Sequence, residues 1–153
     1  MSAPPRIEAA GPADLPALVE LLGLLFAQEA EFRPDPAAAQ RGLAQILATP
    51  ALGRLLLARG ADGQVLGMVN LLFSVSTALG APVAWLEDVI VRPGHRGQGL
   101  GRQLVEAAQA AARAHGCRRI TLLTDGDNLR AQAFYAGLGF HGSPMRPMRC
   151  LLD

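Results

Sequence analysis

The stretch that most constrains the fold runs from Val89 to Arg102 and reads VIVRPGHRGQGLGR. Its β-branched beginning predicts a buried strand, which Pro93 ends because proline has no N–H for a strand ladder. A turn with four glycines follows, and Leu100 and Leu104 then begin a series of apolar positions at helical spacing. This order of strand, glycine-rich turn and helix predicts an anion site, because the first N–H groups of a helix lack internal partners and the helix dipole is positive there.

The spacing of the glycines separates this turn from two common phosphate-binding loops. Gly97, Gly99 and Gly101 lie too close together for the dinucleotide fingerprint, and Leu100 stands where a P-loop needs lysine. The pattern that does fit is Arg-x-x-Gly-x-Gly, formed by Arg96, Gly99 and Gly101. An ordinary glycine-rich turn has the same letters, so the rest of the chain must decide.

Length and composition exclude several classes of protein. The 153 residues, half of them hydrophobic, predict one domain, and no apolar run is long enough to span a membrane. A formal net charge of +1 with mixed signs predicts neither a nucleic-acid nor a membrane partner. Cys117 and Cys150 lack metal-ligand spacing, so free thiols and no metal are expected. The beginning of the chain is unlike a signal peptide, and a cytoplasmic location is expected.

Apolar periodicity predicts a mixed α/β domain. The expected strands are 6–9, 53–59, 64–75, 83–92 and 117–124, with one or two more within 140–151. The expected helices are 12–32, 36–47, 99–115 and 128–137. An Asp62-Gly63 turn predicts a hairpin and, with strand 83–92, an antiparallel meander. Strands 83–92 and 117–124 flank a helix and should be parallel neighbours.

A second informative stretch covers residues 128–140. Asn128 is a good helix N-cap, and one of two following glycines should end the helix. Phe134 would then pack in the core, with Tyr135 as an amphipathic neighbour. The letters also read Asn-x-x-Ala-x-x-Phe-Tyr-x-x-x-Gly-Phe.

That pattern, the Arg96 loop and the residues Trp85–Val89 together resemble the GNAT superfamily of N-acetyltransferases. Residues 83–140 are similar to spermidine/spermine N-acetyltransferases and their bacterial relatives. The resemblance implies the GNAT fold, a central mixed, splayed sheet of about six to seven strands flanked by about four helices. It also implies acetyl-CoA as co-substrate and direct acetyl transfer to a primary amine, without an acyl-enzyme.

The resemblance places acetyl-CoA on the strand, the turn and the second motif. Its expected binding residues are Val89, Ile90, Val91, Arg96, Gly97, Gln98, Gly99, Leu100, Gly101, Arg102, Asn128 and Phe134. The pantetheine arm would pair with the backbone of Val89 and Val91, and the amide following Val89 would donate to the thioester oxygen. Tyr135 is implied as the acid that protonates the leaving thiolate, with core packing as the alternative.

The base is expected to be Glu87 or Asp88. Adjacent strand residues face opposite sides, so only one of the two lines the acceptor cleft unless a bulge intervenes. The Leu-Glu-Asp alignment favours Glu87, and a salt-bridged carboxylate is the alternative.

An acidic corner, defined as Glu29, Glu31 and Asp35, lies between the first two expected helices. It is expected, with Asp88, to bind a small cationic amine, unless it is simply solvated. Asp35 is also well placed to cap helix 36–47. A protein or peptide N-acetyltransferase and a non-catalytic acyl-CoA-binding module remain as alternatives, and the sequence leaves a homodimer open.

Overall fold

The computed structural model describes residues 3–29 and 31–152, which divide between Leu123 and Thr124 into two compact units, called the first and the second unit. The elements of the first unit are β1 (Arg6–Ala9), α1 (Leu15–Gln28), α2 (Pro36–Ala48), β2 (Gly53–Arg59), β3 (Val65–Ser76), β4 (Ala81–Val91), α3 (Leu100–Ala114) and β5 (Ile120–Leu122). Short 3-10 turns lie at Pro12–Asp14 and Pro93–His95. The second unit contains α4 (Leu129–Ala136).

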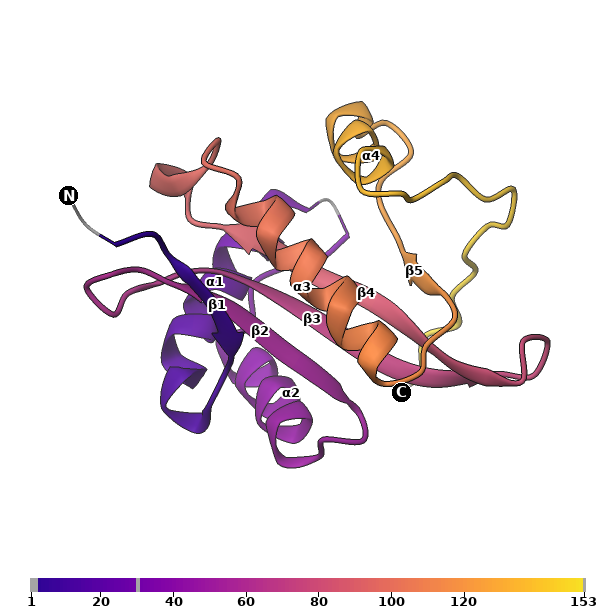
Figure 1. The fold of residues 1–153 in the computed structure, drawn as a ribbon, viewed down its shortest axis with the longest axis horizontal. Helices are drawn as coiled ribbons and strands as arrows, with labels where there is room; N and C mark the ends of the chain where they lie inside the picture. Colours follow the sequence, from indigo (N-terminus) through magenta and orange to yellow (C-terminus); the bar gives the residue numbers. More distant parts are fainter. Residues whose placement is uncertain (1–2, 30, 153) are drawn as a thin grey trace. The chain divides into compact units, whose positions relative to one another are not determined.

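The strands of the first unit form one mixed sheet in the order β1-β2-β3-β4-β5 (Figure 1). Neighbours from β1 to β4 are antiparallel, and β5 runs parallel to β4 after the crossover through α3. Gly63 makes the predicted hairpin turn between β2 and β3 with a φ of 88°. The predicted meander and the parallel pair are both confirmed.

The pairing between β4 and β5 is short. It joins Ala84, Trp85 and Leu86 to residues 120–122, whereas β4 continues to Val91. In the part of the chain that the structure describes, no strand pairs with this far end of β4 on the β5 side. The predicted splayed sheet is therefore present, and its open edge is residues 87–91 of β4.

The helices of the first unit cover both faces of the sheet. On one face, α1 and α2 pack against a core that includes Leu57, Met68 and Ile90. On the other face, α3 crosses β3 so closely that a Cβ on Gly67 would lie 3.1 Å from a Leu104 methyl carbon. The same Cβ would meet the Ile90 carbonyl oxygen at 2.8 Å, so this crossing requires glycine.

Among the described residues the sheet has five strands, so the prediction of about six to seven strands is wrong. No strand occurs within the described part of residues 140–151, where one or two were expected. Pro144 and Pro147 remove two ladder donors from this segment, and its residues are largely exposed. A few apolar residues around two prolines therefore do not make a strand.

The first long helix is also shorter than the expected 12–32. It begins with a 3-10 turn at Pro12–Asp14, and α1 ends at Gln28, after which Glu29 is extended. Glu29 and Glu31 follow the negative end of the helix dipole, where carboxylates are unfavourable. The chain therefore leaves the helix before Pro34.

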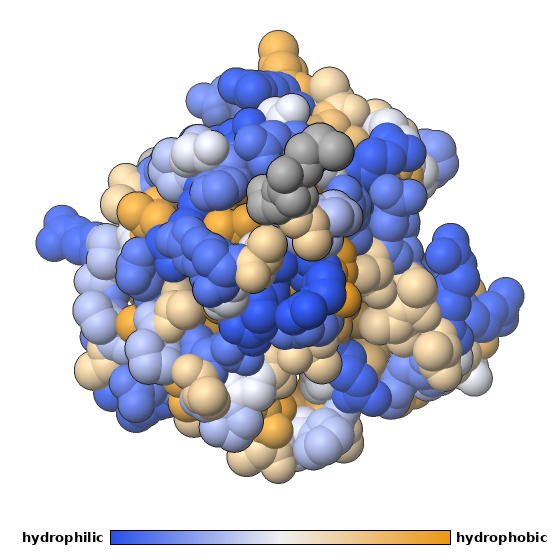
Figure 2. Space-filling model, turned by 60° about the vertical axis from the view of Figure 1, so that its left-hand side comes forward, coloured by the Kyte–Doolittle hydropathy of each residue, from blue (hydrophilic) through white to orange (hydrophobic). Residues whose placement is uncertain are grey.

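Hydrophilic side chains cover much of the face drawn in Figure 2, and hydrophobic ones show between them in small groups. The largest fully buried side chains belong to α1, α3 and the strands β2 and β3. Within the described residues no helix is long and apolar enough to cross a bilayer.

Candidate active site

A β-bulge in β4 is the main irregularity of the sheet. The register between β3 and β4 shifts between Met68 and Asn70, so that β4 has an extra residue at this point. Asp88 lies there with a φ of 56°, and it alone among the described non-glycine residues has a positive φ. Such a conformation is costly for a residue with a Cβ, so the surrounding structure must hold it.

Asp88 is mostly buried and has one hydrogen-bond donor. The Nδ2 of Asn70, on the neighbouring strand β3, donates to the Asp88 Oδ2 over 3.1 Å. Burial raises the pKa of Asp88, and the bond from Asn70 opposes this shift without cancelling it. The raised pKa lies closer to neutral pH than that of an ordinary carboxyl group, which suits a group that accepts a proton during a reaction.

Asp88 and Asn70 line a pocket of about 270 Å³ on the α1 and α2 side of the sheet. Its larger wall residues come from both helices and the loop between them, and are Leu22, Phe26, Phe32, Leu43 and Ile46. Ala38, Ala39 and Gly42 on α2 leave the space open. The pocket is therefore apolar except for Asn70 and Asp88 and two exposed loop residues, Arg33 and Asp35.

The two candidate carboxylates, Glu87 and Asp88, lie in different surroundings at the bulge. Asp88 lines the pocket, whereas Glu87 is exposed and is not among the residues that line it. Glu87 as the base stays a prediction, and Asp88, the other of the two candidates, is the one that lines the pocket.

The acidic corner does not come together as one group at the pocket. Asp35 lines the pocket, but its Oδ1 also accepts the Ala38 N–H over 3.1 Å, which confirms it as the N-cap of α2. Glu29 and Glu31 are not among the lining residues, whereas the cation of Arg33 is. Residue 30 lies outside the described part of the chain.

The glycine-rich turn has the backbone geometry of an anion site. Gly97 and Gly99 have φ values of 79° and 82°, and Gly99 is the N-cap of α3. A Cβ on either would meet nothing within 4 Å, so conformation and not space requires glycine here. Among the described residues, none accepts a hydrogen bond from the backbone N–H groups of residues 100–102. Leu100 itself is buried and anchors the helix start.

The open edge of β4 carries outward-facing backbone groups. Arg92 N donates to Leu66 O over 2.7 Å. In an antiparallel pair the backbone groups of successive residues point alternately toward the partner strand and away from it, so those of Ile90 point toward β3 and those of Val91 point away from it. The Arg96 Nε donates to the outward Val91 oxygen over 3.2 Å. This alternation directs the N–H of Ile90 toward β3, and the expectation that the amide following Val89 faces the thioester stays a prediction. Alternation leaves Val89 and Val91 on the edge.

The second unit contains the other predicted motif. The Asn128 side chain accepts the Ala131 N–H over 3.1 Å, which confirms it as the N-cap of α4. Tyr135 packs edge-on against Phe134 and Phe140, with ring centroids 5.0 and 5.7 Å apart. Burial raises the pKa of Tyr135, so its hydroxyl keeps its proton near neutral pH and can donate it.

Comparison with known proteins identifies the family. The acetyltransferase (GNAT) family model matches residues 17–140. The chain belongs to this family. An aminoglycoside N(6')-acetyltransferase type 1 from Stenotrophomonas maltophilia is 34% identical over 140 residues, which cover 89% of this chain and 86% of that protein.

Solved structures agree with this assignment. A Trypanosoma brucei acetyltransferase is 27% identical with a TM-score of 0.76, covering 97% of this chain and 99% of that one. An aminoglycoside N-acetyltransferase in complex with CoA has the same fold, with a TM-score of 0.82 at 22% identity over 99% of this chain and 96% of that one. The predicted family, fold class and enzyme class, a GNAT acetyltransferase, are confirmed.

Sequence reasoning missed Asn70. The available signal was an asparagine within the otherwise apolar run Val65–Phe73, a position where a polar side chain is expensive unless it has a partner or a task. Its partner, Asp88, lies on the next strand and is brought opposite only by the bulge.

Proposed function

We propose that this chain transfers the acetyl group of acetyl-CoA directly to the primary amine of a small cationic molecule. The observation that carries the proposal is the buried Asp88 at the bulge, which lines a pocket next to the open edge of β4. The name of the Stenotrophomonas relative, an aminoglycoside acetyltransferase, supports an amine as acceptor.

The co-substrate fits the first unit in two places. The free N–H groups at the start of α3, with the guanidinium of Arg96 nearby in sequence, would bind the pyrophosphate. The outward backbone groups of Val89 and Val91 would pair with the amide groups of the pantetheine arm, and the Val91 oxygen would exchange its present bond from the Arg96 Nε for one from the arm. The remaining predicted contacts, Gln98, Gly101, Arg102, Asn128 and Phe134, stay predictions.

The reaction needs a neutral amine, because the ammonium form has no lone pair. Asp88 would accept a proton from the amine, directly or through water, as the nitrogen attacks the thioester carbon. The C–N bond forms and the C–S bond breaks, and Tyr135 would donate a proton to the departing thiolate. Glu87 is the second candidate for the base.

The size and lining of the pocket favour a small acceptor over a peptide. At about 270 Å³ it lies near the lower end of small-ligand sites, about 300–1,000 Å³, and its walls come from helices on one side of the sheet. A peptide acceptor would instead need an extended groove.

The direct test measures the release of free CoA thiol from acetyl-CoA with a panel of amines and amino-terminal peptides. Turnover with at least one small primary amine, and none with the peptides, is the expected result. Activity with peptides alone would favour a protein N-acetyltransferase.

Co-substrate binding is tested by calorimetry with CoA. Gly99→Val forces a β-branched residue into a left-handed conformation, and Arg96→Glu places a carboxylate beside phosphate, so both should weaken binding. Gly94→Val is the matched control, because Gly94 has an ordinary φ and open space around it. Equal CoA affinity in all three folded variants would contradict the assignment.

The acid role is tested with Tyr135→Phe, which keeps the ring packing against Phe134 and Phe140. Turnover should fall about 10²–10⁴-fold with little change in CoA affinity. Wild-type turnover would show that Tyr135 only packs.

A further inference from the structure

We propose that the pocket takes the primary amine of a monoamine with an apolar arm, and that Asn70 and Asp88 together hold the two N–H bonds of its reacting nitrogen. The inference rests on the proposed function and names its acceptor class. Asn70 is the new element, as a specificity-determining residue on β3.

The side-chain oxygen of Asn70 is buried and has no hydrogen-bond donor among the described residues. The residue is only 4% exposed, and among the described residues no donor reaches its Oδ1. A buried acceptor without a donor costs about 1–3 kcal/mol, so a ligand N–H that reaches it gains correspondingly. The χ2 torsion of asparagine is soft, and a small rotation would present Oδ1 to the pocket while Nδ2 stays near Asp88.

Asn70 and Asp88 form the polar end of the pocket, and this end consists mainly of hydrogen-bond acceptors. The Asn70 Oδ1 and the Asp88 carboxylate are acceptors, and the one donor there, Asn70 Nδ2, is already bonded to Asp88. A neutral primary amine offers two N–H bonds to two acceptors, which leaves its lone pair free to attack. A secondary amine offers one N–H and leaves one acceptor unpaired.

The remaining wall of the pocket is mostly apolar. The rings of Phe26 and Phe32, 5.8 Å apart, and the side chains of Leu22, Leu43 and Ile46 offer no partner for a second ammonium. Of the two charged lining residues, Arg33 repels a cation and Asp35 already accepts a helix N–H. Burying a second charge without a partner is costly, so a polyamine or an aminoglycoside should fit poorly.

The experiment compares kcat/KM for four probes, namely 2-phenylethylamine, its N-methyl derivative, spermidine and kanamycin. The wild-type protein should prefer 2-phenylethylamine to each of the others by about tenfold or more, the equivalent of one lost hydrogen bond to a buried acceptor. A preference for spermidine or kanamycin would overturn the inference and leave the acetyltransferase function standing. No transfer to any amine would overturn both.

Two variants test Asn70 itself. Asn70→Leu should reduce kcat/KM for 2-phenylethylamine about tenfold and bring its ratio to the N-methyl amine near one, with the KM for acetyl-CoA unchanged. Asn70→Asp covers the case in which the leucine variant fails to fold: it keeps an acceptor for the amine but replaces the donor to Asp88 by a second carboxylate, so the amine ratio should stay while the acidic limb of kcat/KM moves to higher pH. Ser74→Ala, on the same strand and exposed, is the control and should change neither value.

A pH profile separates recognition from mere packing. Because the Asn70 bond lowers the pKa of Asp88, its loss in Asn70→Leu should move the acidic limb of kcat/KM to higher pH. An unchanged amine ratio together with an unmoved limb in a folded Asn70 variant would overturn the role given to Asn70.

Discussion

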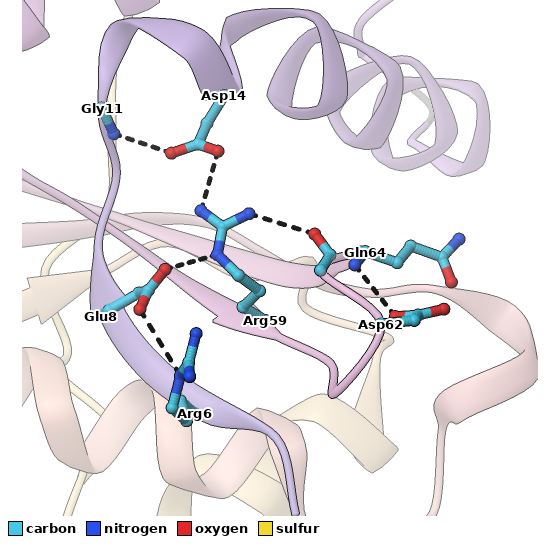
Figure 3. Close-up of polar contacts among 8 residues, drawn as sticks. Arg6, Glu8, Gly11, Asp14, Arg59, Asp62 and Gln64 are labelled. Carbon is cyan, nitrogen blue, oxygen red and sulfur yellow. Dashed lines mark hydrogen bonds and ion pairs between the residues drawn. The ribbon is translucent and has the colours of Figure 1, made fainter. Parts of the chain in front are cut away.

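Two partly buried carboxylates of the first unit, Asp14 and Asp88, have opposite surroundings. Asp14 belongs to the Arg59 cluster (Glu8, Asp14 and Arg59), which ties β1 to β2 (Figure 3). It accepts the Gly11 N–H and an Arg59 N–H, each over 2.8 Å. Asp88 has one neutral donor, Asn70, and within the described residues it forms no ion pair.

The pKa values of the two carboxyl groups follow these partners. Burial alone would raise the pKa of Asp14, but the bonds from Arg59 and Gly11 outweigh it, and the pKa is lowered. At Asp88 burial prevails over the single bond, and the pKa is raised. Asp14, with a full set of partners, is expected to stabilise the fold, and Asp88, with a single neutral donor, is the proposed proton acceptor.

The largest effect is expected from the loss of the Asp88 carboxylate, and it concerns acetyl transfer. Asp88→Asn removes the proton acceptor but can still accept the Asn70 N–H, so acetyl transfer should fall about 10²–10⁴-fold. The free energy of unfolding at pH 7 should not decrease, because a buried charge is removed. Both are measured on the same preparation, by thiol release and by urea unfolding. If Glu87→Gln loses the activity and Asp88→Asn keeps it, the base is Glu87.

The next largest effect is expected from a change in the Arg59 cluster, and it concerns the free energy of unfolding. Arg59→Met leaves Asp14 without its cation and Glu8 with only the longer contact to Arg6, and the free energy of unfolding should fall by about 1–3 kcal/mol. The turnover of the folded fraction should stay at the wild-type value. Arg41→Met, at an exposed position of α2, is the matched control. Equal urea midpoints for the two variants would show that the cluster adds no stability.

A smaller effect sharpens the comparison through pH. The folded pKa of Asp14 lies below its ordinary value of 3.8, so its stabilising contribution is present above pH 3.8 and is lost as the pH falls through the folded pKa. The folded pKa of Asp88 lies above 3.8, so its contribution is greatest below pH 3.8 and is lost as the pH rises through the folded pKa.

Urea unfolding from pH 3 to 7 should therefore show opposite trends for the two positions. The difference between wild type and Asp14→Asn should grow with pH, while the difference between wild type and Asp88→Asn should move the other way. Parallel trends would contradict the assignment of one structural and one reactive carboxylate.

The smallest effect concerns Asp35, a third carboxylate that lines the pocket but is already used as a cap. Asp35→Asn keeps a good N-cap, whereas Asp35→Ala should cost about 1 kcal/mol of stability. Neutralising the whole acidic corner (Glu29→Gln, Glu31→Gln, Asp35→Asn) should raise the acceptor KM no more than roughly two- to fivefold, the range of an exposed charge pair.

A larger rise in KM that disappears at high salt would show that the corner gathers the substrate electrostatically. The KM for acetyl-CoA should be unaffected in this triple variant.

Local chemistry was sufficient for much of the fold. The alternation of apolar residues predicted β1 and β2 with their bounds, and Asp35 and Asn128 were identified as caps, because caps and turns depend on neighbouring residues only. Glycine spacing after a strand pointed to the anion site for the same reason. The family resemblance carried the enzyme class, which matching relatives confirm.

The tertiary structure decided what depends on pairing between distant residues. A bulge is a property of two strands in register, so only the sheet shows that Asp88 rather than Glu87 lines the pocket. Asn70 and Asp88 are 18 positions apart, and nothing in either local sequence marks the other as its partner. The segment 140–151 was expected to hold a strand and forms none, because Pro144 and Pro147 lack the N–H that a strand ladder needs. The sequence by itself determined the elements and the family, and long-range registration determined the site.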